Sequence, residues 1–317
     1  MVVEKTDGTY FSPQETGRTA AVSFVSVVIT QSALTLVPLY FHSYFLSLQL
    51  AISAMVLFIS LALGRLCKRL ARLRASASLS MCFHIVFVWA VYFVVLRQVG
   101  RWYVDVVIHG EMMMLLAALY SVASVDPGLV RSKALIPDAN GEPNITELED
   151  SASKLISRTR QCKVCNRYVK GYDHHCAAFR NCIGEKNYNL FIVVLLGFVC
   201  TESSYILCSF QFLRAIQILE TNPVKLSLEV RFATSTMLFC LLQIMWQVLF
   251  LCWHIYCICI NIKTDEWVNW RNYPEFYIIL PLQPGLNPGV SYSQKRFRNP
   301  YDKGFLRNLK EFLELGL

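Results

Sequence analysis

Six long apolar segments constrain this 317-residue chain more than any other feature of its sequence. A helix needs about 20 mostly apolar residues to cross a bilayer, and each segment has roughly that length. Charged residues make up only 16% of the chain, whereas a soluble domain has about 25%. These properties predict an all-α polytopic membrane protein and exclude a water-soluble enzyme or a disordered tail. The predicted spans are 19–40, 44–64, 78–96, 103–124, 190–213 and 232–260.

Lysine and arginine gather on one side of the predicted spans. If the N-terminus is cytoplasmic, 25 of the 30 Lys and Arg residues lie on the cytoplasmic side. Short loops follow this positive-inside pattern most closely, and residues 65–74 alone hold five basic side chains. We therefore expect both termini and the long loop 125–189 in the cytoplasm of an endomembrane or plasma-membrane protein. The same loops account for the net charge of +8 without a nucleic-acid partner.

The polar segments have different compositions. Residues 1–18 lack the apolar core and small-residue cleavage site of a removable signal peptide, so we do not expect one. The charge distribution makes 1–18 the predicted cytoplasmic N-terminus. Residues 131–157 are acidic, carry Pro and Gly and lack aromatic side chains, which predicts that 125–157 is a mobile cytoplasmic linker. Asn144 begins a glycosylation sequon in this linker and would stay unmodified on the cytoplasmic side. Residues 158–189 are rich in cysteine, and 261–317 form the predicted cytoplasmic tail.

The cysteine-rich segment has the residue types of a zinc site. Cys162 and Cys165 form a C-x2-C pair, whose tight turn offers two thiolates to one tetrahedral Zn²⁺. Two further ligands are then needed. The sequence offers four candidates for them: His174, His175, Cys176 and Cys182.

The same segment also has the parts of a cysteine nucleophile. Adjacent side chains of an extended segment point to opposite sides, so His174 and His175 cannot easily serve one metal ion. The same argument allows Cys176 to stay free of the metal. A thiol beside an imidazole, itself beside the carboxylate of Asp173, can act in nucleophilic catalysis. A purely structural zinc knuckle that uses any four of these groups is the alternative.

Asp173-His174-His175-Cys176 resembles the signature of the DHHC protein S-acyltransferases, also called palmitoyltransferases. Further segments resemble other motifs of that family in the same order, and the resemblance covers about 103–317. The first two spans, 19–64, look like an addition to the four spans usual in the family, which correspond to 78–124 and 190–260. The further motifs are Asp126-Pro127-Gly128, Cys182-Ile183-Gly184 with Asn187, Tyr188 and Phe191, Lys263-Thr264-Asp265-Glu266, and Asn299-Pro300-Tyr301-Asp302-Lys303-Gly304 with Asn308.

The resemblance implies an enzyme that transfers a long-chain acyl group, such as palmitoyl, from acyl-CoA to cysteine thiols of membrane-associated proteins. Cys176 would carry the acyl group, His174 would act as the base, and Asp173 would orient His174. The acyl chain would lie among the spans, in contact with membrane lipid. The implied ligands of a structural zinc ion are Cys162, Cys165, His175 and Cys182.

Six basic residues of the cysteine-rich segment are candidates for binding the CoA phosphates, since phosphate favours Arg and Lys donors. They are Arg160, Lys163, Arg167, Lys170, Arg180 and Lys186. The alternative is that these side chains contact anionic lipid headgroups at the cytoplasmic face.

The sequence lacks every ligand of the first of the two zinc sites that are usual in the family. The family's first zinc site would need a His at position 161 and a Cys at position 168, where this chain has Gln161 and Tyr168. It would also need a C-x2-C pair before Cys162, but 129–161 contains no Cys. We therefore predict one zinc ion instead of two. The Pro-Trp that usually follows the signature is replaced by Ala177-Ala178.

Two other functions compete with acyl transfer. The departures favour a catalytically weak DHHC-like protein that acts as a partner or scaffold. Ionisable groups at the start of the fourth span (Asp105, His109 and Glu111) would suit a transporter.

The cytoplasmic tail contains one predicted helix. Four apolar residues share one helical face, which predicts a short amphipathic helix on the bilayer or on the spans: Phe305, Leu309, Phe312 and Leu313.

Overall fold

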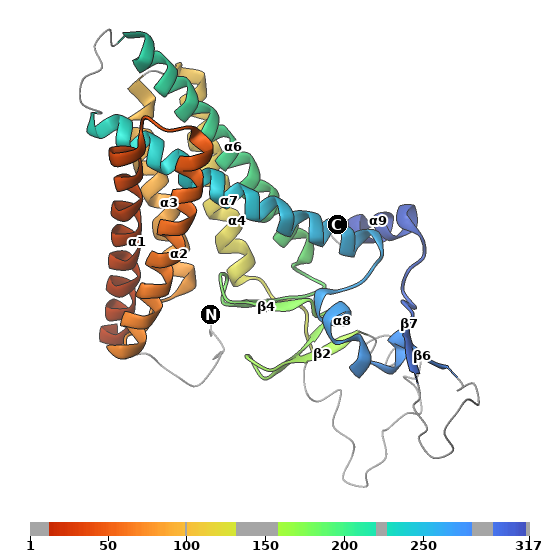
Figure 1. The fold of residues 1–317 in the computed structure, drawn as a ribbon. Coiled ribbons are helices and arrows are strands. Elements are labelled where there is room, and N and C mark those ends of the chain that lie inside the picture. Colours follow the sequence, from red (N-terminus) through yellow and green to blue (C-terminus); the bar gives the residue numbers. More distant parts are fainter. Residues whose placement is uncertain (1–12, 99, 131–157, 220–226, 281–293, 315–317) are drawn as a thin grey trace, which may run out of the picture. The chain divides into compact units, whose positions relative to one another are not determined.

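The computed structural model describes residues 13–98, 100–130, 158–219, 227–280 and 294–314 (Figure 1). This part of the chain contains six helices that are long and apolar enough to cross a membrane. They are α1 (Pro13–Phe41), α2 (Leu46–Leu70), α3 (Ala77–Val94), α4 (Trp102–Ser124), α6 (Tyr188–Leu219) and α7 (Leu228–Cys259). The predicted multi-pass all-α architecture is confirmed, and several helices extend beyond the predicted spans.

The chain divides into two compact units. The first contains the described residues up to Tyr120 together with 177–179 and 193–249, and the second contains 121–176, 180–192 and 250–317. In the first unit, Val27, Leu34 and Val37 of α1 are buried, while Phe24 and Ile29 are more than half exposed. In water such exposed apolar surface would promote aggregation, but on a membrane span it faces lipid.

The second unit contains three small antiparallel sheets and several short helices. A three-stranded sheet has the order β1 (Leu129–Val130), β3 (Arg167–Lys170), β2 (Thr159–Cys162). Two hairpins are formed by β4 (His174–Cys176) with β5 (Asn181–Ile183), and by β6 (Tyr277–Leu280) with β7 (Gln294–Phe297). The helical turns are η1 (Leu96–Gln98, in the first unit), α8 (Thr264–Asn269), η3 (Trp270–Asn272), η4 (Pro274–Phe276) and α9 (Phe305–Glu314).

Asp126 organises the turn at the start of the predicted linker. Its carboxylate accepts the backbone N–H groups of Gly128 (2.9 Å) and Leu129 (2.8 Å), and the chain then enters β1. Gly128 has φ +103°, a left-handed conformation that favours glycine. The rest of that linker, residues 131–157 with the sequon at Asn144, lies outside the described residues, as do residues 1–12.

Gly184 lets this turn pack against the cysteine-rich hairpins. A Cβ at position 184 would lie 2.4 Å from the carbonyl oxygen of Pro127 and 2.6 Å from Cγ1 of Val169. Both are closer than any ordinary contact, and one partner is backbone. The Asp-Pro-Gly and Cys-Ile-Gly motifs are therefore linked by packing in the second unit.

We expect Gly184→Ala to destabilise the second unit by roughly 1–3 kcal/mol, the usual cost of overpacking a close contact. Thermal unfolding of the purified variant in detergent would measure the effect. Gly110→Ala in α4 is the matched control, because a Cβ there meets nothing within 4 Å. Equal unfolding midpoints for the two variants would show that the contact at position 184 is not limiting.

The C-terminal motif closes the end of α7. Asn308 of α9 donates to the carbonyl of Cys259 (2.8 Å), and Asn299 donates to the carbonyl of Ile260 (2.6 Å). The Cys259 carbonyl belongs to the last turn of α7 and that of Ile260 follows directly, where helix carbonyls lack partners of their own. The predicted amphipathic helix is present as α9, where Leu309 is half-buried and Leu313 is exposed.

Candidate active site and metal centre

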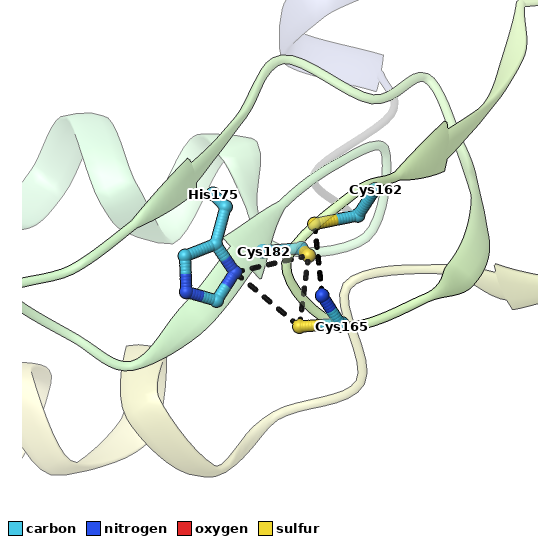
Figure 2. Close-up of side chains that lie close together, drawn as sticks. All are labelled: Cys162, Cys165, His175 and Cys182. Carbon is cyan, nitrogen blue, oxygen red and sulfur yellow. Dashed lines mark hydrogen bonds between the residues drawn. The ribbon is translucent and has the colours of Figure 1, made fainter. Parts of the chain in front are cut away.

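Four of the predicted metal ligands converge in the second unit. Cys162 ends β2 and Cys165 lies in the turn after it, while His175 of β4 and Cys182 of β5 are direct cross-strand partners. Their ligand atoms all lie within 4.8 Å of one another (Figure 2). Two β-hairpins that are separate in sequence thus supply the four donors of one cluster.

The spacing of these donors fits a tetrahedral ion. With Zn–S about 2.3 Å and Zn–N about 2.0 Å, two sulfurs lie about 3.8 Å apart and a sulfur and a nitrogen about 3.5 Å apart. The Cys182 and Cys165 sulfurs are 3.7 Å apart. His175 Nδ1 lies 3.3 Å from Cys165 Sγ and 3.6 Å from Cys182 Sγ (Figure 2). Three cysteines and one histidine at these separations are a suitable ligand set for zinc.

Two positions of the family's first zinc site, 161 and 168, lie side by side but carry other side chains. Gln161 and Tyr168 are cross-strand partners in β2 and β3. The Gln161 amide donates to the Asn166 side chain at 2.8 Å. Among the described residues, only the cluster with Cys162 has four suitable donors.

β4 places the two neighbouring histidines in different surroundings. His175 points to the metal cluster, whereas Nδ1 of His174 lies 2.8 Å from Oδ2 of Asp173. Cys176 is not among the four clustered donors, and it forms a side-chain hydrogen bond with His174. The alternation of side chains along β4 therefore places the imidazole of His174 and the thiol of Cys176 on the face opposite His175. The Asp173 carboxylate, which precedes the strand, completes the series through its hydrogen bond with His174.

Burial and hydrogen bonding set the charges of this series. Burial raises the pKa of Asp173, but the hydrogen bond and charge of His174 outweigh it and hold that pKa below its ordinary value. Burial lowers the pKa of His174, yet its hydrogen bonds with Asp173 and Cys176 prevail and raise it to about 9. A carboxylate stabilises the protonated form of the imidazole beside it, and a protonated imidazole in turn favours the thiolate form of a neighbouring cysteine.

The start of α8 holds the carboxylate of Asp173 in place. The backbone N–H of Thr264 donates to Asp173 Oδ1 at 2.9 Å, and that of Asp265 donates to the Asp173 carbonyl at 3.1 Å. Asp173 is fully buried, so each of these bonds satisfies a group that water cannot reach. The Lys-Thr-Asp-Glu motif thereby orients the residue that orients His174.

A buried ion pair fixes the same motif from the other side. Arg158 donates through two nitrogens to the carboxylate of Glu266, at 2.7 and 2.5 Å. Its third nitrogen donates to Asn261 Oδ1 at 2.7 Å, and its guanidinium lies 4.2 Å from the centre of the Tyr301 ring. Glu266 is 1% exposed. Such a bidentate pair is geometrically specific and connects the start of the cysteine-rich segment to the tail.

Two further residues, His254 and Lys263, lie near the series. His254 of α7 is 1% exposed and accepts or donates a hydrogen bond with Tyr188 at 3.1 Å. The ring centres of His254 and His174 are 6.0 Å apart, and Phe191 contacts both rings edge to face. The side chain of Lys263 lies 3.9 Å from the centre of the Tyr188 ring. Nothing in the local sequence signals this aromatic surround.

The six basic candidates for CoA phosphate fall into two groups. Arg160 pairs with Glu275, Lys170 with Glu185 at 3.0 Å, and Lys186 with Asp126 at 2.8 Å. Lys163 and Arg180 are exposed and have no ion-pair partner among the described residues, while Arg167 is half-buried in β3. The structure thus engages three of the six side chains with carboxylates of the chain itself.

The chain combines six candidate membrane-spanning helices with a four-donor cluster suited to zinc and an adjacent Asp-His-Cys series. These features are those of a membrane-bound acyltransferase. The family model described as "DHHC palmitoyltransferase" matches residues 151–271. The chain therefore carries a DHHC palmitoyltransferase domain, as the resemblance of its motifs predicts.

Curated relatives agree with this assignment. "Probable protein S-acyltransferase 15" of Arabidopsis thaliana is 29% identical over 60% of this chain and 70% of the relative. "Palmitoyltransferase ZDHHC12" of Mus musculus is 28% identical over 61% of this chain and 67% of the relative. "Palmitoyltransferase AKR1" of Mortierella alpina is 41% identical over 19% of this chain, a match that spans only 11% of the relative. The match to "Palmitoyltransferase ZDHHC17" of Danio rerio likewise spans 31% of that protein.

Proposed function

We propose that this chain is a protein S-acyltransferase that transfers palmitoyl or a similar long acyl group from acyl-CoA to cysteine thiols of membrane-associated proteins. The hydrogen-bonded series of Asp173, His174 and Cys176 carries the proposal, because it gives a DHHC domain its nucleophile. The names of the curated relatives support the same reaction.

The proposed chemistry has two symmetrical steps. The thiol proton of Cys176 moves to His174, whose raised pKa favours the imidazolium–thiolate pair, and the thiolate attacks the thioester carbon of acyl-CoA. The bond from that carbon to the CoA sulfur breaks, and CoA leaves as a thiol after it receives the proton from His174. A substrate cysteine then attacks the acyl group on Cys176 with the same proton exchange. Asp173 holds the imidazole in the orientation that both steps need.

The metal ligands have a structural part in this proposal. Cys162, Cys165, His175 and Cys182 would hold one zinc ion and so tie two hairpins together. A zinc ion with four protein ligands supplies rigidity and leaves no open position for water. The attachment of His175 to the ion would fix the strand that also carries His174 and Cys176.

Lys163 and Arg180 are the strongest candidates for the CoA phosphates, because neither is paired with a carboxylate among the described residues. Arg160, Lys170 and Lys186 would have to exchange a carboxylate for a phosphate first. The 25-to-5 distribution of Lys and Arg supports a cytoplasmic placement of the termini and of the DHHC domain. Acyl-CoA and the target cysteines would then meet the site from the cytoplasm.

Labelled palmitoyl-CoA tests the proposed function directly. The purified chain should take up label that resists denaturation and is released by neutral hydroxylamine, which cleaves thioesters. A protein that holds one zinc ion and never labels would instead be the catalytically weak partner or scaffold. Ala177, which takes the place of the usual Pro after the signature, would then be the first position to restore.

We expect His174→Ala to slow acyl labelling by about 10²–10⁴-fold, the usual contribution of a general base. Zinc content should stay near one per chain, because His174 is outside the donor cluster. Initial rates of labelling and metal analysis of the same sample measure both effects. An unchanged labelling rate would assign proton transfer to another group.

A transporter is the weaker alternative. The three ionisable groups that motivated it have partners within the first unit: Asp105 pairs with Arg97 at 2.9 Å, His109 accepts from Trp89 at 2.8 Å, and Glu111 accepts from Ser204 at 3.1 Å. Groups that hold helices together in this way need no transported ion to explain them.

A further inference from the structure

A cluster of positive charge in the first unit has no role in the proposed chemistry. Arg65, Lys68, Arg69 and Arg72 lie where α2 ends and turns toward α3, and we name them the α2–α3 basic cluster. The sequence has no Asp or Glu anywhere between residues 16 and 104. Among the described residues, no ion pair involves any of the four.

The cluster sits on ordered backbone. Arg65, Lys68 and Arg69 have the i, i+3, i+4 spacing that places side chains on one helix face. The helix then ends in a Schellman motif: the N–H of Leu73 donates to the Lys68 carbonyl at 2.8 Å, and that of Arg72 to the Arg69 carbonyl at 3.3 Å. Arg72 has φ 52°, in the left-handed position that this motif normally gives to glycine. In this chain an arginine occupies a position where the backbone favours a residue without a side chain.

Apolar side chains accompany the basic ones. Leu66 and Leu70 belong to the same last turns of α2 and are 51% and 74% exposed. A helix of 25 residues is about 37 Å long at 1.5 Å per residue, whereas the hydrocarbon core of a bilayer is about 30 Å thick. The last turns of α2 therefore reach the headgroup level, with leucines beside guanidinium and ammonium groups. A ligand with both an acyl chain and phosphate groups matches this surface better than a soluble anion.

We propose that the α2–α3 basic cluster binds the headgroup of an anionic phospholipid with several phosphates, of the phosphoinositide class. Arg and Lys form charge-assisted hydrogen bonds to phosphate oxygens. Four uncompensated charges within eight residues favour a multiply charged headgroup over a singly charged one. The cytoplasmic orientation proposed above places the cluster in the leaflet where such lipids gather. This inference is independent of acyl transfer, because the cluster lies on helices that the catalytic series does not use.

The test uses the full-length chain in detergent micelles and a fluorescent short-chain phosphatidylinositol 4,5-bisphosphate as the probe. Fluorescence anisotropy gives its affinity for the wild type and for Arg65→Gln/Lys68→Gln/Arg69→Gln. Each basic residue near an anionic surface contributes roughly fivefold, so the triple variant should bind about 100-fold more weakly. The matched control is Lys295→Gln/Arg296→Gln/Arg298→Gln, three exposed residues of the second unit. It lowers the net charge by the same amount and should bind like the wild type.

Two further arms separate the alternatives. Arg65→Lys/Lys68→Arg/Arg69→Lys keeps the charge and should retain affinity within a few-fold. Soluble inositol 1,4,5-trisphosphate lacks acyl chains and should compete poorly. The inference is overturned if Arg65→Gln/Lys68→Gln/Arg69→Gln binds like the wild type. It is also overturned if the control Lys295→Gln/Arg296→Gln/Arg298→Gln weakens binding equally, which would indicate a response to net charge alone. Competition by the soluble phosphate at the same affinity would also overturn it, because the ligand would then not be a lipid.

Discussion

Cys176→Ser is expected to abolish hydroxylamine-sensitive labelling by palmitoyl-CoA while the zinc content stays near one per chain. Serine keeps much of the shape of cysteine, but its hydroxyl ionises far too weakly at neutral pH to replace a thiolate. Cys176 lies outside the four-donor cluster, so its loss removes no ligand. The measurement combines fluorography or scintillation counting of the label with elemental analysis of the same purified protein.

The control for this experiment is another cysteine on the same chain. Cys252 is exposed and belongs neither to the cluster nor to the catalytic series. Cys252→Ser should label like the wild type, or lose only a minor labelled fraction. If Cys176→Ser also loses zinc, Cys176 is a ligand and the cysteine-rich segment is a structural knuckle. If Cys252→Ser removes the label instead, the acylated residue is a lipid anchor and not an enzyme intermediate.

Loss of one metal ligand should have an equally large effect of a different kind. Cys182→Ser removes a buried donor that connects β5 to both Cys165 and His175. Structural zinc contributes about 10–16 kcal/mol to the folding of zinc-finger peptides, which matches or exceeds the whole stability of a typical domain, about 5–15 kcal/mol. We therefore expect Cys182→Ser to lose zinc, to unfold the cysteine-rich hairpins and to lose labelling as a consequence. Metal analysis, limited proteolysis of residues 158–189 and palmitoyl-CoA labelling would measure the three effects.

The neighbouring histidines give this prediction its sharpest control. His175→Ala should release zinc and increase proteolysis, as Cys182→Ser does. His174→Ala should leave both unchanged and affect only the rate of labelling. A stoichiometry of two zinc ions in the wild type would contradict the single-site assignment. Retention of zinc by His175→Ala would mean that another donor completes the cluster.

The membrane spans and the metal ligands were predictable because both depend on short stretches of sequence. A run of about 20 apolar residues specifies a spanning helix almost by itself. A C-x2-C turn brings Cys162 and Cys165 together locally, and strand alternation separates His174 from His175. The order of motifs then indicated a DHHC domain. The assignment of Cys182 and not Cys176 to the cluster rested on the family resemblance, and the pairing of β4 with β5 agrees with it.

Other features of the site depend on contacts between residues far apart in the chain. The Thr264 N–H that holds Asp173 comes from a position 91 residues further along, and His254 is 66 residues from its partner Tyr188. The six basic candidates look alike in the sequence, yet distant carboxylates such as Glu275 engage three of them. Sequence periodicity and spacing report which side chains a segment offers. Only the tertiary structure decided which groups are buried, paired or charged, because those properties depend on neighbours that folding brings together.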